Sequence, residues 1–376
     1  MEDPLSVPAE HFLHERYAGT GRRSRALSTY YAVKPVLPRG VQLTLRRGYA
    51  RRQMRRRFPA WPIETVLVDR WHAELRKELR EAGRDEVAFV DFWPRGSRFA
   101  FVLTHDVEGP GGIENIPRVL EVEQRHGVVS SWNFVAEWYP IPAGTFARLR
   151  AEGCEIGLHG IRHDGRLFQS RAQFESELPK IHRYLAEWGA AGFRSPATGR
   201  NAAWMHELEC VYDSSFPDTD PFEPQAGGCC SILPFFFGDV VELPITLVQD
   251  HTLFEILRER SIARWIEKCE WLIRNHGLIN VIVHPDYVRD ADRLALYDEL
   301  LVFLTSQRGA WHALPRDVAT WWRARAGLEI GPNGRIAGPP NAAEGLEPAV
   351  AIARQAAGRL SFLRAEPGGV GMEAGG

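Results

Sequence analysis

The sequence has few cysteines, no long uncharged apolar run and almost no net charge. Its 376 residues include five cysteines without a C-x-x-C pair or a regular spacing, so we predict neither a disulfide framework nor a zinc ribbon. No stretch of about 18 uncharged apolar residues occurs, so we predict no membrane-spanning helix. The formal net charge of -2 argues against nucleic-acid binding by the molecule as a whole.

The N-terminal sequence lacks the apolar segment that is typical of a signal peptide. It begins Met1-Glu2-Asp3-Pro4 and continues with mixed polar residues. We therefore expect a reducing, cytoplasmic location. Such a location disfavours a mature cell-wall substrate and favours a soluble or lipid-linked precursor that is made inside the cell.

Positive charge is concentrated near the N-terminus. Residues 16–63 contain thirteen Lys or Arg and no Asp or Glu. Within them, arginine pairs alternate with apolar residues such as Leu45 and Tyr49, which suits a helix with one cationic face. This face could be a solvated or interdomain surface. Alternatively, residues 22–57 could contact anionic lipid or polysaccharide at a membrane surface.

Composition divides the chain into three zones. Residues 1–95 form a basic, partly helical extension, and residues 96–325 alternate short apolar runs with longer helical patterns. Residues 326–376 are rich in Gly, Pro and Ala, so we predict a mostly disordered, flexible tail with a short helix near residues 347–364. No pattern in the sequence indicates an oligomeric state.

The middle zone predicts an α/β fold, because strand-like and helix-like segments follow one another in alternation. The predicted strands are residues 99–104, 128–134, 155–158, 192–194, 209–213, 240–243, 278–283 and 311–314. The predicted helices are residues 116–126, 145–152, 171–188, 202–207, 262–276, 291–306 and 316–324. Seven or eight such units over about 230 residues favour a distorted (β/α) barrel over an open sheet.

Polar residues follow four of the predicted strands. The first run ends in Thr104-His-Asp-Val-Glu108, with two carboxylates two residues apart. Another ends in His159-Gly-Ile-Arg-His163, where two imidazoles can converge on one metal ion if the intervening turn is helical. Two more end in Arg194-Ser-Pro196 and His284-Pro285. Because reactive groups in such barrels lie at the C-terminal ends of strands, this order predicts an active site there.

This ordered set of motifs resembles the polysaccharide deacetylases, also called carbohydrate esterase family 4, over about residues 97–325. The resemblance implies one bound divalent metal ion, with zinc as the expected ion. It implies Glu108, His159 and His163 as the metal ligands.

The same resemblance implies three catalytic roles. Asp106 matches the general base, Arg194 the arginine that orients this base, and His284 the general acid. The implied activity is hydrolysis that removes an acetyl or similar acyl group from an N-acylated sugar or polysaccharide precursor. A backbone N–H near Pro196 is expected to help hold the oxyanion of the tetrahedral intermediate.

The first motif departs from the commonest family pattern. Two adjacent aspartates are usual there, whereas Val107 takes the second place in this chain. The sequence resembles a subset with Asp-Val-Asp, in which Glu108 here replaces the second aspartate and is longer by one methylene. His105 is an alternative ligand, although strand alternation directs it away from Asp106.

Other questions stay open at this stage. The aspartate that tunes the acid histidine has three candidates, Asp213, Asp218 and Asp220. A non-catalytic carbohydrate-binding barrel with an altered metal site is the main alternative function. Hydrolysis of a non-sugar linear amide is a further alternative, because the same chemistry cleaves any amide that fits.

Overall fold

Buried apolar runs form the strands of the main sheet in the computed structural model, which describes residues 7–18, 38–339 and 345–364. The central strand β2 (Phe99–Val107) is buried along its whole length. It pairs in parallel with β9 (Leu278–Ile282) along one edge, and with β10 (Ala310–His312) and β3 (Ser131–Phe134) along the other.

From β3 the parallel sheet continues through four more strands. In spatial order these are β4 (Glu155–Leu158), β5 (Gly192–Phe193), β6 (Tyr212–Asp213) and β8 (Val240–Glu242). An antiparallel strand that the sequence did not predict, β7 (Phe235–Phe237), pairs with the free edge of β8.

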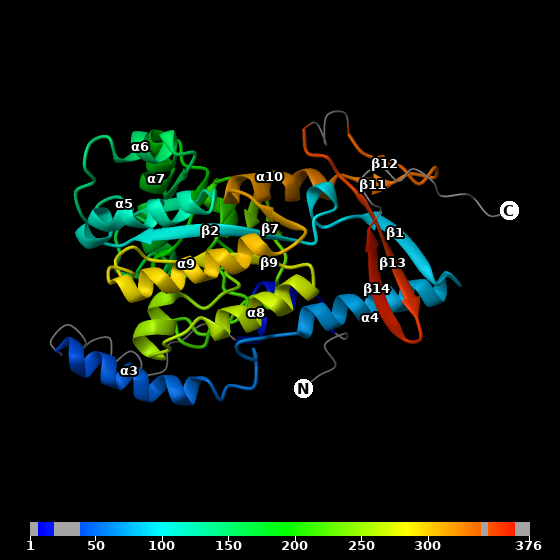
Figure 1. Cartoon of the computed structure of the whole chain (residues 1–376), viewed down its shortest axis with the longest axis horizontal. Coiled ribbons are helices and arrows are strands. Elements are labelled where there is room, and N and C mark those ends of the chain that lie inside the picture. Colours follow the sequence, from blue (N-terminus) through cyan, green and yellow to red (C-terminus); the bar gives the residue numbers. More distant parts are fainter. Residues whose placement is uncertain (1–6, 19–37, 340–344, 365–376) are drawn as a thin grey trace.

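Side chains bridge the gap between β8 and β9. Asn280 on β9 donates a hydrogen bond to the carbonyl of Leu243 at 3.1 Å. Thr246 Oγ1 donates to the carbonyl of Leu278 at 2.8 Å and accepts from the amide of Asn280 at 2.9 Å. The sheet therefore curls into a distorted (β/α) barrel, which confirms the predicted fold class (Figure 1).

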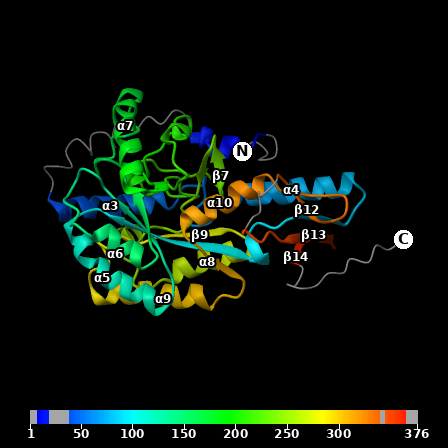
Figure 2. The same cartoon turned by 90° about the horizontal axis from the view of Figure 1, so that it is seen from above.

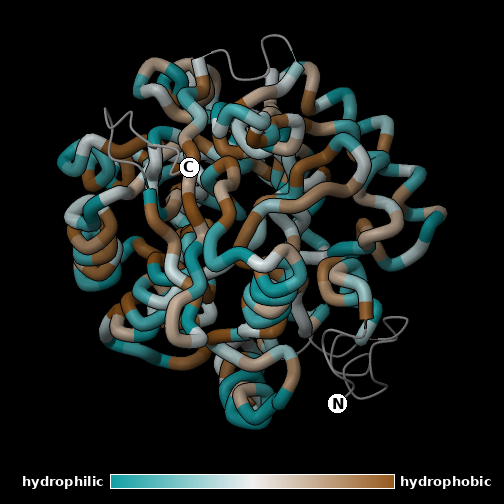
Figure 3. The backbone as a smooth tube through the Cα atoms, turned by 90° about the vertical axis from the view of Figure 1, so that its right-hand side faces the viewer, coloured by the Kyte–Doolittle hydropathy of each residue, from teal (hydrophilic) through white to brown (hydrophobic). Residues whose placement is uncertain are grey.

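Helices follow most of the parallel strands and cover the barrel (Figure 2). They are α5 (Pro110–Arg125), α6 (Thr145–Ala151), α7 (Arg171–Trp188), α8 (Ala263–Arg274), α9 (Ala291–Ser306) and α10 (Pro315–Ala326). In Figure 3, hydrophobic and hydrophilic residues alternate within the helical turns at the surface, as expected for helices that bury one face. The helix predicted at residues 202–207 is only a short 3-10 turn, Met205–Leu208.

The N-terminal extension contains α3 (Arg39–Gln53), α4 (Val66–Glu81) and β1 (Glu86–Val90). No helix in the described part of the chain is long and apolar enough to cross a membrane.

The C-terminal residues form a hairpin, so the helix predicted near residues 347–364 is wrong, whereas the flexibility of this zone stays a prediction. β13 (Val350–Ala356) pairs with β14 (Arg359–Arg364) and, on its other edge, with β1. The connecting residues Ala357 and Gly358 both have positive φ, +48° and +75°, which is the geometry of a two-residue hairpin turn. The predicted flexible residues 365–376 lie outside the described residues, and the zone boundaries near 95 and 325 remain predictions.

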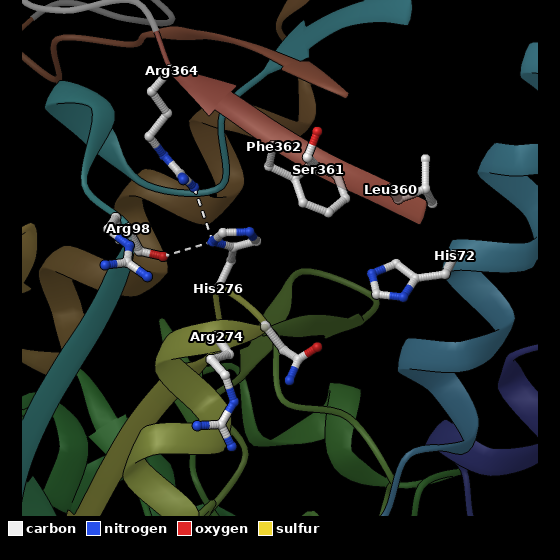
Figure 4. Close-up of a pocket in the computed structure, with 9 residues that line it drawn as sticks. His72, Arg98, Arg274, His276, Leu360, Ser361, Phe362 and Arg364 are labelled. Atoms are coloured by element: carbon white, nitrogen blue, oxygen red, sulfur yellow. Dashed lines mark hydrogen bonds between the residues drawn. The ribbon is translucent and has the colours of Figure 1, made fainter. Parts of the chain in front are cut away.

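The hairpin meets the barrel at the N-terminal end of β2 and β9. A cavity of about 620 Å³ lies there, and Figure 4 shows Arg98, His276, Phe362 and Arg364 around it. His276 Nδ1 lies 3.2 Å from the carbonyl of Arg98 and 3.2 Å from a guanidinium nitrogen of Arg364. None of the six residues implicated by the sequence motifs lines this cavity.

Candidate active site

The six side chains implicated by the sequence come together at the C-terminal ends of four parallel strands. Two belong to the end of β2, two to the turn after β4, one follows β5 and one follows β9. The contacts that join them are Asp106–Arg194 at 3.0 Å, Glu108–His163 at 3.0 Å and Glu108–His284 at 3.6 Å, and His159 lies beside Glu108 and His163.

Glu108, His159 and His163 form a compact set of donors suited to a metal ion. One ligand atom from each lies within 4.8 Å of the others. Donors bound at 2.0–2.2 Å to one tetrahedral ion lie about 3–4 Å apart, so the set needs only a small contraction. Nε2 of both histidines is buried without a hydrogen-bond partner in the described residues, including His163 Nε2, which is close to Glu108 but poorly aligned with it. The residues therefore fit a divalent cation.

The tautomer of His159 favours metal binding through Nε2. Its Nδ1 lies 3.0 Å from the carbonyl of Arg194, and a carbonyl can only accept, so Nδ1 carries the proton. Burial lowers the pKa of His159 to about 4. The ring is therefore neutral at neutral pH, and Nε2 presents a free lone pair.

The backbone after β2 is held so that Glu108 faces this cluster. Asp286 accepts hydrogen bonds from the amides of Glu108 and Gly112, both at 2.9 Å. A Cβ atom at Gly112 would lie only 2.2 Å from an Asp286 oxygen, so this position requires glycine. Tyr287 donates its hydroxyl to Glu108 Oε2 at 2.8 Å. The longer glutamate side chain thus has a defined position.

Asp106 is buried and is oriented through one of its two oxygens. Its Oδ1 accepts from Arg194 at 3.0 Å and from Asn133 at 2.8 Å. Arg194 is itself fixed by donating to Thr104 Oγ1 and to Ser214. Burial alone raises the pKa of Asp106, but the nearby Arg194 charge and other donors outweigh it and hold the pKa below its ordinary value. The carboxylate is therefore ionised, and Oδ2 is left to receive a proton.

His284 is paired with Asp250 on the other side of the site. Its Nδ1 lies 2.6 Å from Asp250 Oδ1, and its amide donates to Asp250 Oδ2 at 2.9 Å. Burial alone lowers the pKa of His284, but the carboxylates of Asp250 and Glu108 outweigh it and raise the pKa to about 10. The ring is therefore cationic at neutral pH, with Nε2 located 3.9 Å from Asp106 Oδ2.

The three aspartates that we considered as partners of His284 lie elsewhere, so that prediction is wrong. Asp218 forms an ion pair with Lys268 at 2.5 Å. Asp220 accepts from the amide of Phe222, and Asp213 accepts from Ser215. Asp213 is the last residue of β6, and Asp218 and Asp220 lie in the loop that follows it.

His105 does not compete for the metal. Its ring points out of the barrel, where Nε2 lies 2.7 Å from Glu123 and Nδ1 lies 2.8 Å from the carbonyl of Val283. Both nitrogens are occupied. Strand alternation predicted this direction, because His105 and Asp106 are neighbours on β2.

Sequence reasoning missed Asn133 and Asp250. Asn133 is the direct ladder partner of Asp106 on β3, but its polar side chain inside an apolar run was the only signal. Its amide oxygen is so close to Gly157 that a Cβ there would lie at 1.9 Å. Asp250 follows β8 in a loop, 34 residues before His284, and no local pattern links the two.

The loop after Arg194 has unusual backbone geometry at the expected oxyanion position. Ala197 and Thr198 adopt positive φ angles of +53° and +48°. Such conformations cost free energy and cluster at functional sites. The oxyanion role of a backbone N–H near Pro196 remains a prediction.

Comparison with known proteins found no matching family model and no similar protein among the curated sequences. Several solved structures are similar. A provisionally assigned polysaccharide deacetylase from Mycobacterium smegmatis is 19% identical, with a TM-score of 0.48 over 63% of this chain and 94% of its own. An allantoinase, Puue, is 15% identical, with a TM-score of 0.49 over 62% and 92%. A family 4 carbohydrate esterase from Streptomyces lividans is 15% identical, with a TM-score of 0.38 over 65% and 99%.

The family that the sequence motifs resemble is therefore also found among the similar structures. At these identities and TM-scores, no residue's role transfers to this chain. The functional argument rests on the geometry of the site itself.

Proposed function

We propose that this protein is a metal-dependent hydrolase that removes an acetyl or similar acyl group from an N-acylated sugar or polysaccharide precursor. One observation carries the proposal: the Glu108–His159–His163 donor set lies beside an ionised Asp106 and a cationic His284. Amide hydrolysis requires these functions together, because water is a weak nucleophile and an amine anion is a poor leaving group.

Glu108, His159 and His163 would hold the divalent cation, for which zinc is the ion we expect from nitrogen and oxygen ligands. Such a cation, when bound, polarises a carbonyl group and lowers the pKa of water. Asp286 and Tyr287 keep Glu108 in position, and Arg194 fixes the ring of His159 through its carbonyl.

Asp106 acts as the general base. Its Oδ2 takes a proton from water while the water oxygen forms a bond to the amide carbon. Arg194 and Asn133 occupy Oδ1, so proton transfer is directed to Oδ2. The amide groups of the strained Ala197–Thr198 turn are candidates to stabilise the oxyanion.

His284 acts as the general acid. Its Nε2 gives a proton to the leaving nitrogen as the C–N bond breaks, which yields an acid and a free amine. The proton on Asp106 is then released, and His284 is reprotonated for the next cycle. Asp250 keeps the ring oriented and favours its cationic form.

An exposed tryptophan supports a sugar substrate. Trp138 follows β3 at the same end of the barrel as the site and is 51% exposed. The next residue, Tyr139, donates its hydroxyl to the carbonyl of Val107 and so ties this loop to the first motif. An exposed ring on the same rim of the barrel as a polar site is suited to stacking on a pyranose face.

The proposal is tested by screening N-acetylated nucleotide sugars and glycans for acetate release, with the Asp106→Asn variant as the control. Release by the wild type and its loss in the variant is the expected result. If metal-free protein binds glycans equally well and releases no acetate, the barrel is a carbohydrate-binding module instead. If the protein cleaves only non-sugar amides, it is a hydrolase of linear amides. Cytoplasmic location stays a prediction, which recovery from periplasm or medium would contradict.

A further inference from the structure

Helix α3 presents an apolar ridge to solvent. Val41, Leu45 and Tyr49 are spaced four residues apart, so they lie on one face, and they are 44%, 50% and 50% exposed. Within the described residues, these are three of the eight large apolar side chains that are exposed. A helix of a globular protein normally turns such a ridge inward.

The opposite face of α3 is already packed on the barrel, so the ridge cannot turn inward. Ala50 is only 2% exposed and packs with Phe222 and Ile256. Arg47 Nε donates to the carbonyl of Glu255 at 3.0 Å. These contacts fix the rotation of the helix about its axis.

Arginines lie on both sides of the ridge and at its C-terminal end. At 100° per residue, Arg46 and Arg51 lie about 100° and 120° to either side of Leu45, and Arg52 lies about 20° from it. None of these three arginines has an ion-pair partner in the part of the chain that the structure describes. Residues 16–63 contain no acidic residue at all.

We propose that α3 docks on an anionic membrane surface. The ridge of Val41, Leu45 and Tyr49 would enter the boundary between headgroups and acyl chains, while the arginines contact lipid phosphates. An anionic membrane surface matches both the apolar ridge and the arginines of the helix. A polyanionic glycan or nucleic acid would neutralise the arginines but leave the ridge in water. A second copy would cover the ridge but bring the arginines of both helices together.

A short helix connects the docking helix α3 with the candidate active site. α3 packs on the single-turn helix η7 (His251–Ile256), which begins directly after Asp250, the partner of His284. Both views place α3 on the half of the molecule that holds α5, away from the C-terminal hairpin (Figures 1 and 2). If the proposed function holds, the substrate class would be glycans attached to membrane lipids. Docking itself does not depend on that function.

The docking proposal is tested by sedimentation with vesicles of phosphatidylcholine alone or mixed with phosphatidylglycerol. We expect the wild type to bind only the anionic vesicles, and less at high salt. Replacing Arg46, Arg51 and Arg52 with Gln should weaken binding about fivefold per arginine, or roughly a hundredfold together. Replacing Val41, Leu45 and Tyr49 with Ser should weaken it at least about tenfold.

Two matched controls separate docking from general adhesion. Val302→Ser with Leu363→Ser removes exposed apolar side chains elsewhere and should bind like the wild type. Lys77→Gln, Arg84→Gln and Arg308→Gln remove three exposed cations outside α3, and the protein should keep most of its binding.

A labelling experiment gives a readout that does not depend on loss of binding. All five native cysteines are buried, so a polarity-sensitive dye should react selectively with Leu45→Cys. Its emission should shift to the blue with anionic vesicles, whereas the same dye on Val302→Cys should not respond. The proposal would be overturned if the wild type did not bind anionic vesicles, or if the emission of the dye on Leu45→Cys did not change with them. It would also be overturned if the only effect of the Ser substitutions were to convert a dimer to a monomer. None of these measurements depends on hydrolysis, so failure of the docking proposal can be distinguished from failure of the proposed activity.

Discussion

The two ends of the barrel contain the same residue types, yet among the described residues only the C-terminal end has buried histidine nitrogens without a hydrogen-bond partner. At the N-terminal end, both oxygens of Asp91 are bonded by Arg364, at 2.7 and 3.1 Å, and one also accepts from the amide of Phe92. Burial outweighs the Arg364 charge and raises the pKa of Asp91. This end joins the C-terminal hairpin to the barrel.

At the C-terminal end, the aspartate is held by only one oxygen. Arg194 and Asn133 bond to Oδ1 of Asp106, and positive charge nearby keeps the pKa of this carboxyl low in spite of burial. Nε2 of His159 and of His163 is buried without a hydrogen-bond partner among the residues that the structure describes. The comparison teaches that buried charge alone does not mark a site, whereas two unpaired imidazole nitrogens gathered beside an ionised carboxylate indicate one here.

The largest expected contrast is between the two aspartates. Asp106→Asn removes the proposed base and should lower the rate of hydrolysis by about 10²–10⁴ while the protein stays folded. Asp91→Asn breaks a buried ion pair and should cost about 3 kcal/mol of stability, with the rate per folded molecule unchanged. Rates and urea unfolding curves of both variants test this. Equal losses of rate in the two variants would remove the distinction between the ends.

The histidines should differ in metal binding. His159→Ala or His163→Ala removes one of three ligands and should weaken binding of a divalent ion at least about a hundredfold. His276→Ala, at the other end, should bind metal like the wild type. Calorimetry with zinc, together with the metal content of purified protein, measures this. Retention of stoichiometric metal by the His159→Ala, His163→Ala double variant would show that the metal is bound elsewhere.

A smaller effect is expected at Asp250, which contacts His284 but not the proposed base. Asp250→Asn removes a carboxylate that raises the pKa of His284, so the cationic ring should be lost at lower pH. We expect a rate about 10–100 times lower at neutral pH and a fall in activity that begins at lower pH on the alkaline side. The pH–rate profile distinguishes this from simple destabilisation, which would not move the alkaline limb.

Local patterns were sufficient to predict the bounds of three elements. Residues 155–158, 171–188 and 291–306 form β4, α7 and α9 with the predicted bounds. Caps explain the two helix starts, since Ser170 and Asp290 each accept from an amide three residues later. The six residues at strand ends converge because parallel strands of one barrel end at one rim.

Features that depend on distant partners could not be predicted. Residues 347–364 are rich in alanine and have high helix propensity, but Ala351 and Ala353 are fully buried where β13 pairs with β1, more than 250 residues earlier. The Asp250–His284 pair likewise joins a loop to a strand end. Such pairings are set by the completed fold and leave no local periodicity.

A further expected effect, on stability alone, concerns Glu155, an acid at the N-terminal start of β4 that we regard as structural. It is buried, and it accepts from the Tyr212 hydroxyl at 2.5 Å and from the amide of Arg316 at 3.3 Å. Burial raises its pKa from 4.5 to about 7, so the folded protein favours the protonated form. The resulting stabilisation is fully present below pH 4.5 and is lost as the pH rises through 7.

Glu155→Gln keeps an acceptor for Tyr212 but cannot ionise. Between pH 5 and 8, the wild type should therefore lose roughly 3 kcal/mol of unfolding free energy relative to the variant. Urea titrations across this range measure the difference, and parallel curves would mean that Glu155 is ionised in the fold and that the N-terminal end also tolerates a buried charge.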